Sequence, residues 1–123
     1  TKVPKPVEAR TRQGAAWGIL TLGSCDGACR EALQHLNDKG IAVDYMRLKA
    51  FPFTAEVEEF LASHERIFVV EQNRDAQLRG MLVNETPVEK AKITSILHYN
   101  GTPMDYHQIV SAIEDAVAKE AAA

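Results

Sequence analysis

The feature of this sequence that most constrains its fold is an uninterrupted apolar run, Ile-Phe-Val-Val, at residues 67–70. A run this short, rich in β-branched and aromatic side chains, is typical of a strand covered on both faces, as in a parallel sheet. A polar cluster, Glu-Gln-Asn-Arg-Asp, follows immediately at residues 71–75. Because ligands and partners usually meet open α/β sheets at the carboxyl ends of the strands, this cluster is a candidate contact region.

Strand and helix signals alternate on both sides of this run. Further strands are expected at 17–22, 41–48 and 93–99, and helical apolar spacing occurs at 24–39, 54–64, 74–84 and from 105 onward. The first helix has a capping candidate in Ser24 or Asp26, and Gly40 suits the left-handed conformation that ends a helix. Four strand–helix units predict a three-layer α/β/α domain with a mainly parallel sheet.

A single domain is expected at residues 15–123, because no internal repeat divides the chain. Residues 1–14 contain Pro4 and Pro6, alternating charges and no periodic apolar face, which predicts an extended linker. Position 1 is Thr and the three methionines lie well inside the chain, so we expect a fragment of a longer polypeptide.

Composition excludes several classes of function. The net charge of −3, with 14 basic and 17 acidic residues, gives no basic footprint for nucleic acid. No apolar run approaches the roughly 20 residues needed to span a bilayer, and the first residues do not form a signal peptide. We therefore expect a cytoplasmic protein that binds neither nucleic acid nor a membrane.

The sequence offers few residues for chemistry. Cys25 and Cys29 are the only cysteines, and their spacing differs from the two intervening residues usual in redox pairs and iron–sulfur sites. We expect them to be small, partly buried side chains. The four histidines form no i,i+4 pair and are expected at the surface or at helix ends. No G-x-G-x-x-G, Walker lysine or G-x-S-x-G is present, so the residues alone indicate no catalytic site.

The polar edge after residues 67–70 has two interpretations. Arg47 and Lys49 alternate along the end of the 41–48 strand and are expected to pair with Glu71 if the two strands adjoin. Asn73 is either a helix N-cap or a contact with a partner domain. The edge is therefore a contact surface for another domain, or it binds a small anionic regulator through Arg47, Lys49 and Arg74.

Three segments closely resemble the alpha subunit of 2-oxoacid:ferredoxin oxidoreductases, the 2-oxoglutarate type being nearest. They are YMRLKAFPF at 45–53, EVEEFL at 56–61 and FVVEQNRDAQL at 68–78. Flanking segments at 23–24, 30–33 and 97–103 agree, so that the resemblance covers nearly all of residues 14–118. The leading VPKP at 3–6 resembles the linker that enters the last domain of that subunit.

The resemblance implies a transketolase C-terminal-like fold, with three layers around a mixed sheet that admits one antiparallel strand. It also implies a holoenzyme that oxidatively decarboxylates a 2-oxoacid with coenzyme A. Such a holoenzyme uses thiamine diphosphate, Mg²⁺ and a [4Fe–4S] cluster to reduce ferredoxin. This domain corresponds to neither thiamine-binding domain, and the sequence agrees, since it lacks the G-D-G motif of the diphosphate–metal site and a set of cluster cysteines.

By resemblance we expect a non-catalytic domain that holds no cofactor itself. It supports assembly with the other domains of the alpha subunit and with a thiamine-binding beta subunit. The candidate contact residues are Arg47, Lys49, Glu71, Gln72, Asn73 and Arg74. Two alternatives stay open: a stand-alone anion-binding regulatory module, and the C-terminal domain of another transketolase-like thiamine enzyme.

Overall fold

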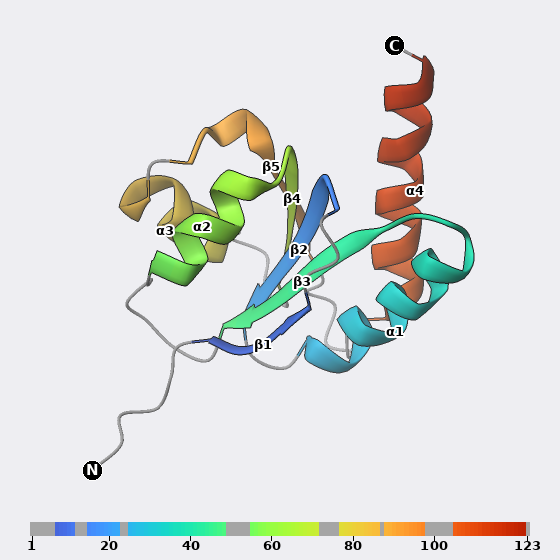
Figure 1. Ribbon diagram of the computed structural model, residues 1–123, viewed down its shortest axis with the longest axis horizontal. Coiled ribbons are helices and arrows are strands. Elements are labelled where there is room, and N and C mark those ends of the chain that lie inside the picture. Colours follow the sequence, from blue (N-terminus) through green and yellow to red (C-terminus); the bar gives the residue numbers. More distant parts are fainter. Residues whose placement is uncertain are drawn as a thin grey trace.

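The computed structural model describes residues 7–11, 15–22, 25–48, 55–71, 77–86, 88–97 and 105–122. These residues form one five-stranded sheet with helices on both faces (Figure 1). The three-layer α/β/α architecture predicted from the sequence is therefore confirmed. No helix in these ranges is long and apolar enough to cross a membrane.

The sheet is parallel except at one edge. Its order is β1-β3-β2-β4-β5, in which β2 (Trp17–Leu22), β3 (Val43–Leu48), β4 (Arg66–Glu71) and β5 (Ile93–Leu97) run parallel. β1 (Val7–Thr11) pairs antiparallel with the outer side of β3, with an irregular register between Val7 and Ala9. The sheet is thus mixed, with one antiparallel strand, as the resemblance implied.

β1 lies inside the stretch that the sequence predicted to be an extended linker. Its sequence, VEART, alternates small or branched apolar residues with charged ones over only five positions, which is a weak strand signal. Short, charged strands are a common way to end a sheet without inviting further pairing. The linker prediction therefore needs correction at residues 7–11, while residues 1–6 and 12–14 lie outside the described ranges.

Two helices cover each face of the sheet (Figure 1). α1 (Asp26–Asp38) and α4 (Tyr106–Ala122) pack over a core that includes Ile19, Tyr45 and Phe68. α2 (Ala55–Ser63) and α3 (Gln77–Glu85) pack over a second core that includes Leu20, Met46 and Val69. Successive strand residues alternate between the two cores, which is why the strands read as continuous apolar runs. A short 3-10 helix, η1 (Lys90–Lys92), leads into β5.

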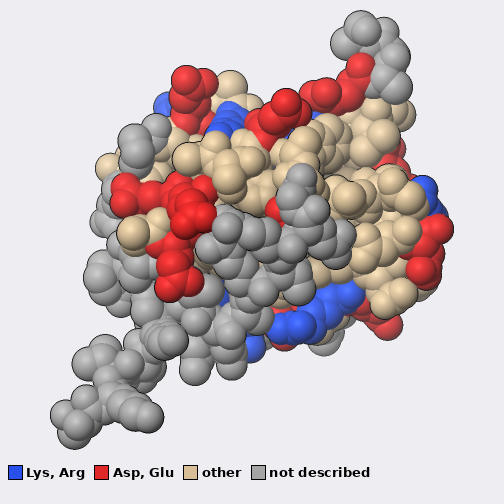
Figure 2. All heavy atoms as spheres, viewed as in Figure 1, with Lys and Arg blue, Asp and Glu red and all other residues tan. Residues whose placement is uncertain are grey.

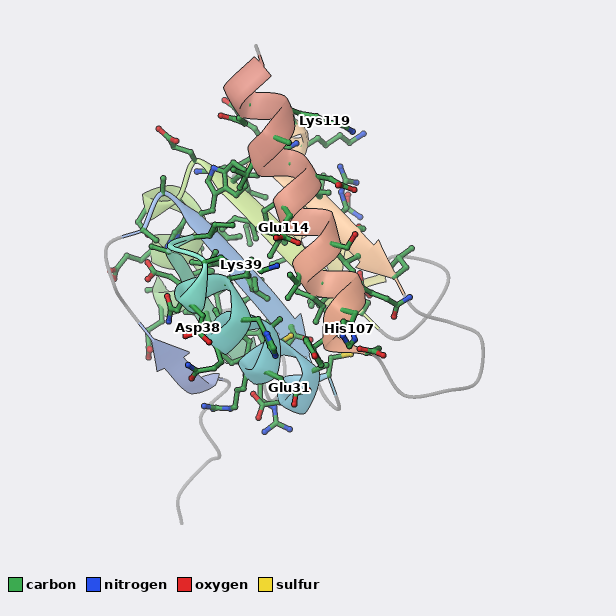
Figure 3. All side chains as sticks on the ribbon, turned by 90° about the vertical axis from the view of Figure 1, so that its right-hand side faces the viewer. Glu31, Asp38, Lys39, His107, Glu114 and Lys119 are labelled. Atoms are coloured by element: carbon green, nitrogen blue, oxygen red, sulfur yellow. The ribbon has the colours of Figure 1, made fainter. Side chains whose placement is uncertain are left out.

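The ends of α1 and α4 fix where these helices lie. Gly40 has a φ of +78°, and the bonds from Ile41 N to Leu36 O (2.9 Å) and from Gly40 N to Asn37 O (3.0 Å) form a Schellman motif. The predicted glycine stop is therefore confirmed. Beyond it, the Lys39 ammonium lies 2.7 Å from the Glu114 carboxylate of α4, and Figure 3 shows these two side chains facing each other.

The helix starts agree less well with the prediction. Cys25 is the N-cap of α1 and makes no side-chain capping bond, while Asp26 lies in the first turn and Ser24 lies outside the described residues. At α4, Asp105 Oδ1 accepts a hydrogen bond from His107 N at 2.9 Å, as expected of a capping residue.

Candidate functional site

The carboxyl edge of the sheet has the geometry of a topological switch point. β2 and β4 are neighbours, yet the chain after β2 leads to α1 on one face and the chain after β4 leads to α3 on the other. Open α/β sheets bind ligands and partners outside the carboxyl ends of strands at such a point. Glu71, the last residue of β4, therefore lies where contacts are usual for this class of fold.

The structure describes two of the six candidate contact residues. Arg47 lies in β3 and Glu71 is the last residue of β4. Lys49, Gln72, Asn73 and Arg74 lie outside the described residues, so their predicted roles stay predictions.

Glu71 is a buried carboxylate, with only 4% of its surface exposed. Its two oxygens accept hydrogen bonds from Leu78 N (2.7 Å) and Arg79 N (3.1 Å) at the start of α3. The first N–H groups of a helix have no partner within the helix, and the positive end of its dipole favours an anion there. Glu71 therefore anchors the N-terminus of α3 to the carboxyl end of β4.

The expected ion pair between Arg47 and Glu71 requires correction. β2 separates β3 from β4, and Arg47 shares its register with Thr21 and Val70, whereas Glu71 projects to the opposite face. The Arg47 guanidinium instead lies 4.0 Å from the Asp26 carboxylate at the start of α1. The ion pair was expected only if the two strands adjoined, and β3 and β4 are not neighbours in the sheet.

Asp26 is the centre of a polar cluster that the sequence analysis did not find. Its carboxylate accepts hydrogen bonds from the Tyr45 hydroxyl and from Arg30 Nε (2.9 Å), with Arg47 nearby. Burial opposes ionisation of Asp26, but the bonds from Tyr45 and Arg30 and the two positive charges outweigh it, so its pKa lies below its ordinary value. Burial, together with the bond to Asp26, raises the pKa of Tyr45 far above its usual range. Two features of the sequence could have indicated this cluster: the i,i+4 spacing of Asp26 and Arg30, and a tyrosine among the apolar residues of β3.

The two cysteines lie beneath this cluster and are buried, as expected of structural side chains. Cys25 is 1% exposed and Cys29 is fully buried. Burial raises the pKa of both thiols, and a hydrogen bond with Thr21 only partly offsets this. The thiolate is the reactive form of cysteine, so neither residue has the environment of a nucleophile.

His64 lies at a helix end, which was one of the two expected positions, but it is buried. It follows α2 directly but is 4% exposed, and its Nε2 lies 2.7 Å from Oδ2 of Asp44, which is itself 2% exposed. Its Nδ1 lies 2.6 Å from Phe60 O. The acidic residue Asp44, between the apolar residues Val43 and Tyr45 of β3, was the signal for a buried partner. This pair sits at the amino-terminal edge of the sheet, away from the switch point.

Comparison with known proteins identifies the family. Residues 15–109 match the model for pyruvate:ferredoxin oxidoreductase core domain II. Subunit alpha of 2-oxoacid:ferredoxin oxidoreductase 2 from Aeropyrum pernix is 29% identical over 102 residues, which are 81% of this chain and 16% of that subunit. This chain therefore spans less than a fifth of that relative's length.

Solved structures agree with this match. The 2-oxoglutarate:ferredoxin oxidoreductase from Magnetococcus marinus, solved with 2-oxoglutarate, coenzyme A and succinyl-CoA bound, is 31% identical with a TM-score of 0.76. The match covers 89% of this chain and 19% of that one. Transketolase from Campylobacter jejuni, at 15% identity and a TM-score of 0.57 over 85% of this chain and 17% of its own, shares the fold alone. The chain therefore belongs to the pyruvate:ferredoxin oxidoreductase core domain II family.

Proposed function

We propose that this chain is a non-catalytic assembly domain of a thiamine diphosphate-dependent oxidoreductase in the cytoplasm. In this proposal the holoenzyme oxidatively decarboxylates a 2-oxoacid to an acyl-CoA and passes the electrons to ferredoxin. The 2-oxoacid is 2-oxoglutarate, by similarity to the Magnetococcus marinus enzyme, whose structure holds 2-oxoglutarate and succinyl-CoA.

The observation that supports the non-catalytic role is that the described ionisable groups at the carboxyl edge already bond to other parts of the domain or are buried. Glu71 caps α3, Asp26 binds Tyr45 and Arg30, and burial keeps the Cys25 thiol protonated. A general acid or base has to reach the proton that it transfers, and a nucleophile has to reach its target. These groups are instead used to hold α1 and α3 against the sheet.

Two of the cofactors that the family resemblance implies, the [4Fe–4S] cluster and Mg²⁺, find no set of ligands among the residues that the structure describes. A [4Fe–4S] cluster is held by four cysteines, whereas the whole chain has two. Within the described ranges, no three His, Cys, Asp or Glu side chains gather to hold a metal ion such as Mg²⁺. The proposal therefore assigns thiamine diphosphate, Mg²⁺ and the cluster to the other domains and to a thiamine-binding beta subunit.

The proposed contact surface is the carboxyl edge of the sheet. In this proposal its polar groups come from Arg47, Lys49, Gln72, Asn73 and Arg74. Glu71 contributes indirectly, by holding the N-terminus of α3 against the sheet. The alternative of an anion-binding module is less well supported, because Arg47, the described member of its three cations, faces the Asp26 carboxylate.

Deleting the domain from the full alpha subunit tests this proposal. The truncated subunit, co-expressed with its partner subunits, is expected to lose stable association in analytical ultracentrifugation. The isolated 123-residue chain is expected to show no heat of binding with thiamine diphosphate and Mg²⁺. Micromolar binding to the isolated chain, or an intact and active complex without the domain, would contradict the proposal.

A further inference from the structure

A groove of about 550 Å³ opens at the amino-terminal edge of the sheet, away from the proposed contact surface. One wall is the C-terminal half of α2 and the residue before β4. The other wall is the connection from α3 to β5, including η1. Ala62, Val88 and Ala91 contribute solvent-accessible apolar surface, while Glu58, Glu65, Glu89 and Lys92 contribute charges. We call this feature the acidic groove.

The second wall is held by specific hydrogen bonds. The Thr86 hydroxyl donates to Leu82 O at 2.6 Å and accepts from Val88 N at 3.4 Å, which closes the end of α3. Arg79 donates from Nη2 to Lys90 O (3.1 Å) and from Nε to Ile93 O (3.3 Å), tying α3 to η1 and β5. These bonds fix the groove's shape, so that a partner meets a preformed surface.

The charges around the groove are mostly uncompensated. Glu58, Glu65 and Glu89 are exposed, and their carboxylates form no hydrogen bond or ion pair with other described residues. Lys92, a cation among the described lining residues, donates to Ala62 O at 3.4 Å, at the C-terminal and therefore negative end of α2. Figure 2 shows acidic atoms over α2 and along the edge of the molecule where η1 lies. The groove therefore attracts positive charge beside an apolar floor.

We propose that the acidic groove docks a lysine- or arginine-bearing segment of a neighbouring subunit. The side-chain stem of such a residue packs on Ala62 and Val88, and its charged head lies among the three glutamates. Long basic side chains favour surfaces that offer an apolar bed and an anionic rim. The inference rests on the proposed assembly role only in requiring a neighbouring subunit. It adds a contact at the edge of the sheet opposite the switch point.

Neutralising the three carboxylates in the full alpha subunit tests this docking. The variant Glu58→Gln/Glu65→Gln/Glu89→Gln is expected to raise the Kd for the partner subunits at least tenfold at low salt. The difference is expected to shrink at high salt, because exposed charges are then screened. The control Glu31→Gln/Asp115→Asn/Glu120→Gln removes three exposed charges from α1 and α4, where Figure 3 labels Glu31. Its Kd is expected to stay within twofold of the native value.

Zero-length carbodiimide cross-linking of the intact complex identifies the occupant. A lysine partner is expected to appear joined to Glu58, Glu65 or Glu89, whereas an arginine partner gives the affinity change without a cross-link. An unchanged Kd for the triple variant overturns the proposal, as do cross-links confined to a second copy of this subunit or to its own other domains. Equal thermal unfolding of both triple variants shows that folding is not the cause. If domain deletion breaks the complex but the groove variant does not, only the docking inference fails.

Discussion

Replacing Asp44 by alanine tests whether its contact with His64 stabilises the fold through a shared proton. Nδ1 of His64 lies 2.6 Å from Phe60 O, and a carbonyl oxygen only accepts, so Nδ1 carries a proton. The 2.7 Å contact between Nε2 and Asp44 Oδ2 also needs a proton, on the nitrogen or on the oxygen. The pair is therefore neutral as a whole, either as imidazolium with carboxylate or as imidazole with carboxylic acid.

The two forms predict different losses of stability. Both side chains are 3% exposed, so removing the Asp44 carboxyl group leaves Nε2 buried without its hydrogen-bond partner. An unpaired neutral group costs about 1–3 kcal/mol. An unpaired buried charge costs about 3–5 kcal/mol. Asp44→Asn is expected to cost less than Asp44→Ala, because the Asn side chain can accept from a protonated Nε2 through its oxygen or donate to an unprotonated Nε2 through its NH2 group.

Urea unfolding of the 123-residue chain at pH 7 measures these losses through Trp17. This residue is the only tryptophan, and its ring centroid lies 5.6 Å from that of Phe68 in the core. Asp44 takes part in another interaction, so a double-mutant cycle with His64→Ala is needed to isolate the pair. We expect a coupling free energy above about 1 kcal/mol. A coupling near zero, with Asp44→Ala costing under about 1 kcal/mol, would refute the reasoning.

Three further predictions concern packing, helix anchoring and acid stability. Gly18→Ala would place a Cβ 2.7 Å from the Phe60 ring and is expected to cost about 1–3 kcal/mol in urea unfolding, whereas the control Gly27→Ala meets nothing within 4 Å and should not destabilise. Glu71→Gln replaces an acceptor of two α3 amides and is expected to cost about 1–2 kcal/mol and to speed hydrogen exchange at Leu78; unchanged exchange there would contradict the anchoring role. The pKa of Asp26 is lowered on folding, so its stabilisation is full above about pH 4 and is lost as the pH falls through the lowered value. The unfolding free energies of Asp26→Asn and the native chain should therefore converge as the pH falls below about 4, and a gap that does not change with pH would argue against this cause.

Much of the fold follows from the sequence because its signals are local. The apolar run at 67–70, the helical spacing around Leu36 and the glycine at position 40 each act within a few residues, and each predicted the element observed. β1 was missed because its strand character depends on pairing with β3, more than 30 residues away. Edge pairing of this kind leaves almost no periodic signal in five residues.

The polar groups were harder to predict, because strand order decides which of them meet. Arg47 and Glu71 appeared to be partners until β2 was seen to lie between β3 and β4. The same order brings Tyr45 of β3 under Asp26 of α1, a contact between residues 19 positions apart. Spacing along the chain gives the face of each strand, but the neighbours of a strand follow only from the full topology.

The described carboxylates at the two edges of this sheet differ in whether their charges are compensated by neighbouring groups. At the carboxyl edge, Glu71 and Asp26 are engaged by backbone amides, a tyrosine and arginines, so their charges serve to hold the helices in place. At the amino-terminal edge, Glu58, Glu65 and Glu89 surround the acidic groove, where the described lining cation, Lys92, is bound to Ala62 O. Exposed, uncompensated charges act on partners over about a Debye length, whereas neutralised ones act only on direct contact. The affinity of this domain for its partners should therefore depend on salt at the acidic groove and on side-chain shape at the switch point. Comparing the salt dependence of the groove variant Glu58→Gln/Glu65→Gln/Glu89→Gln with that of Glu71→Gln separates these contributions.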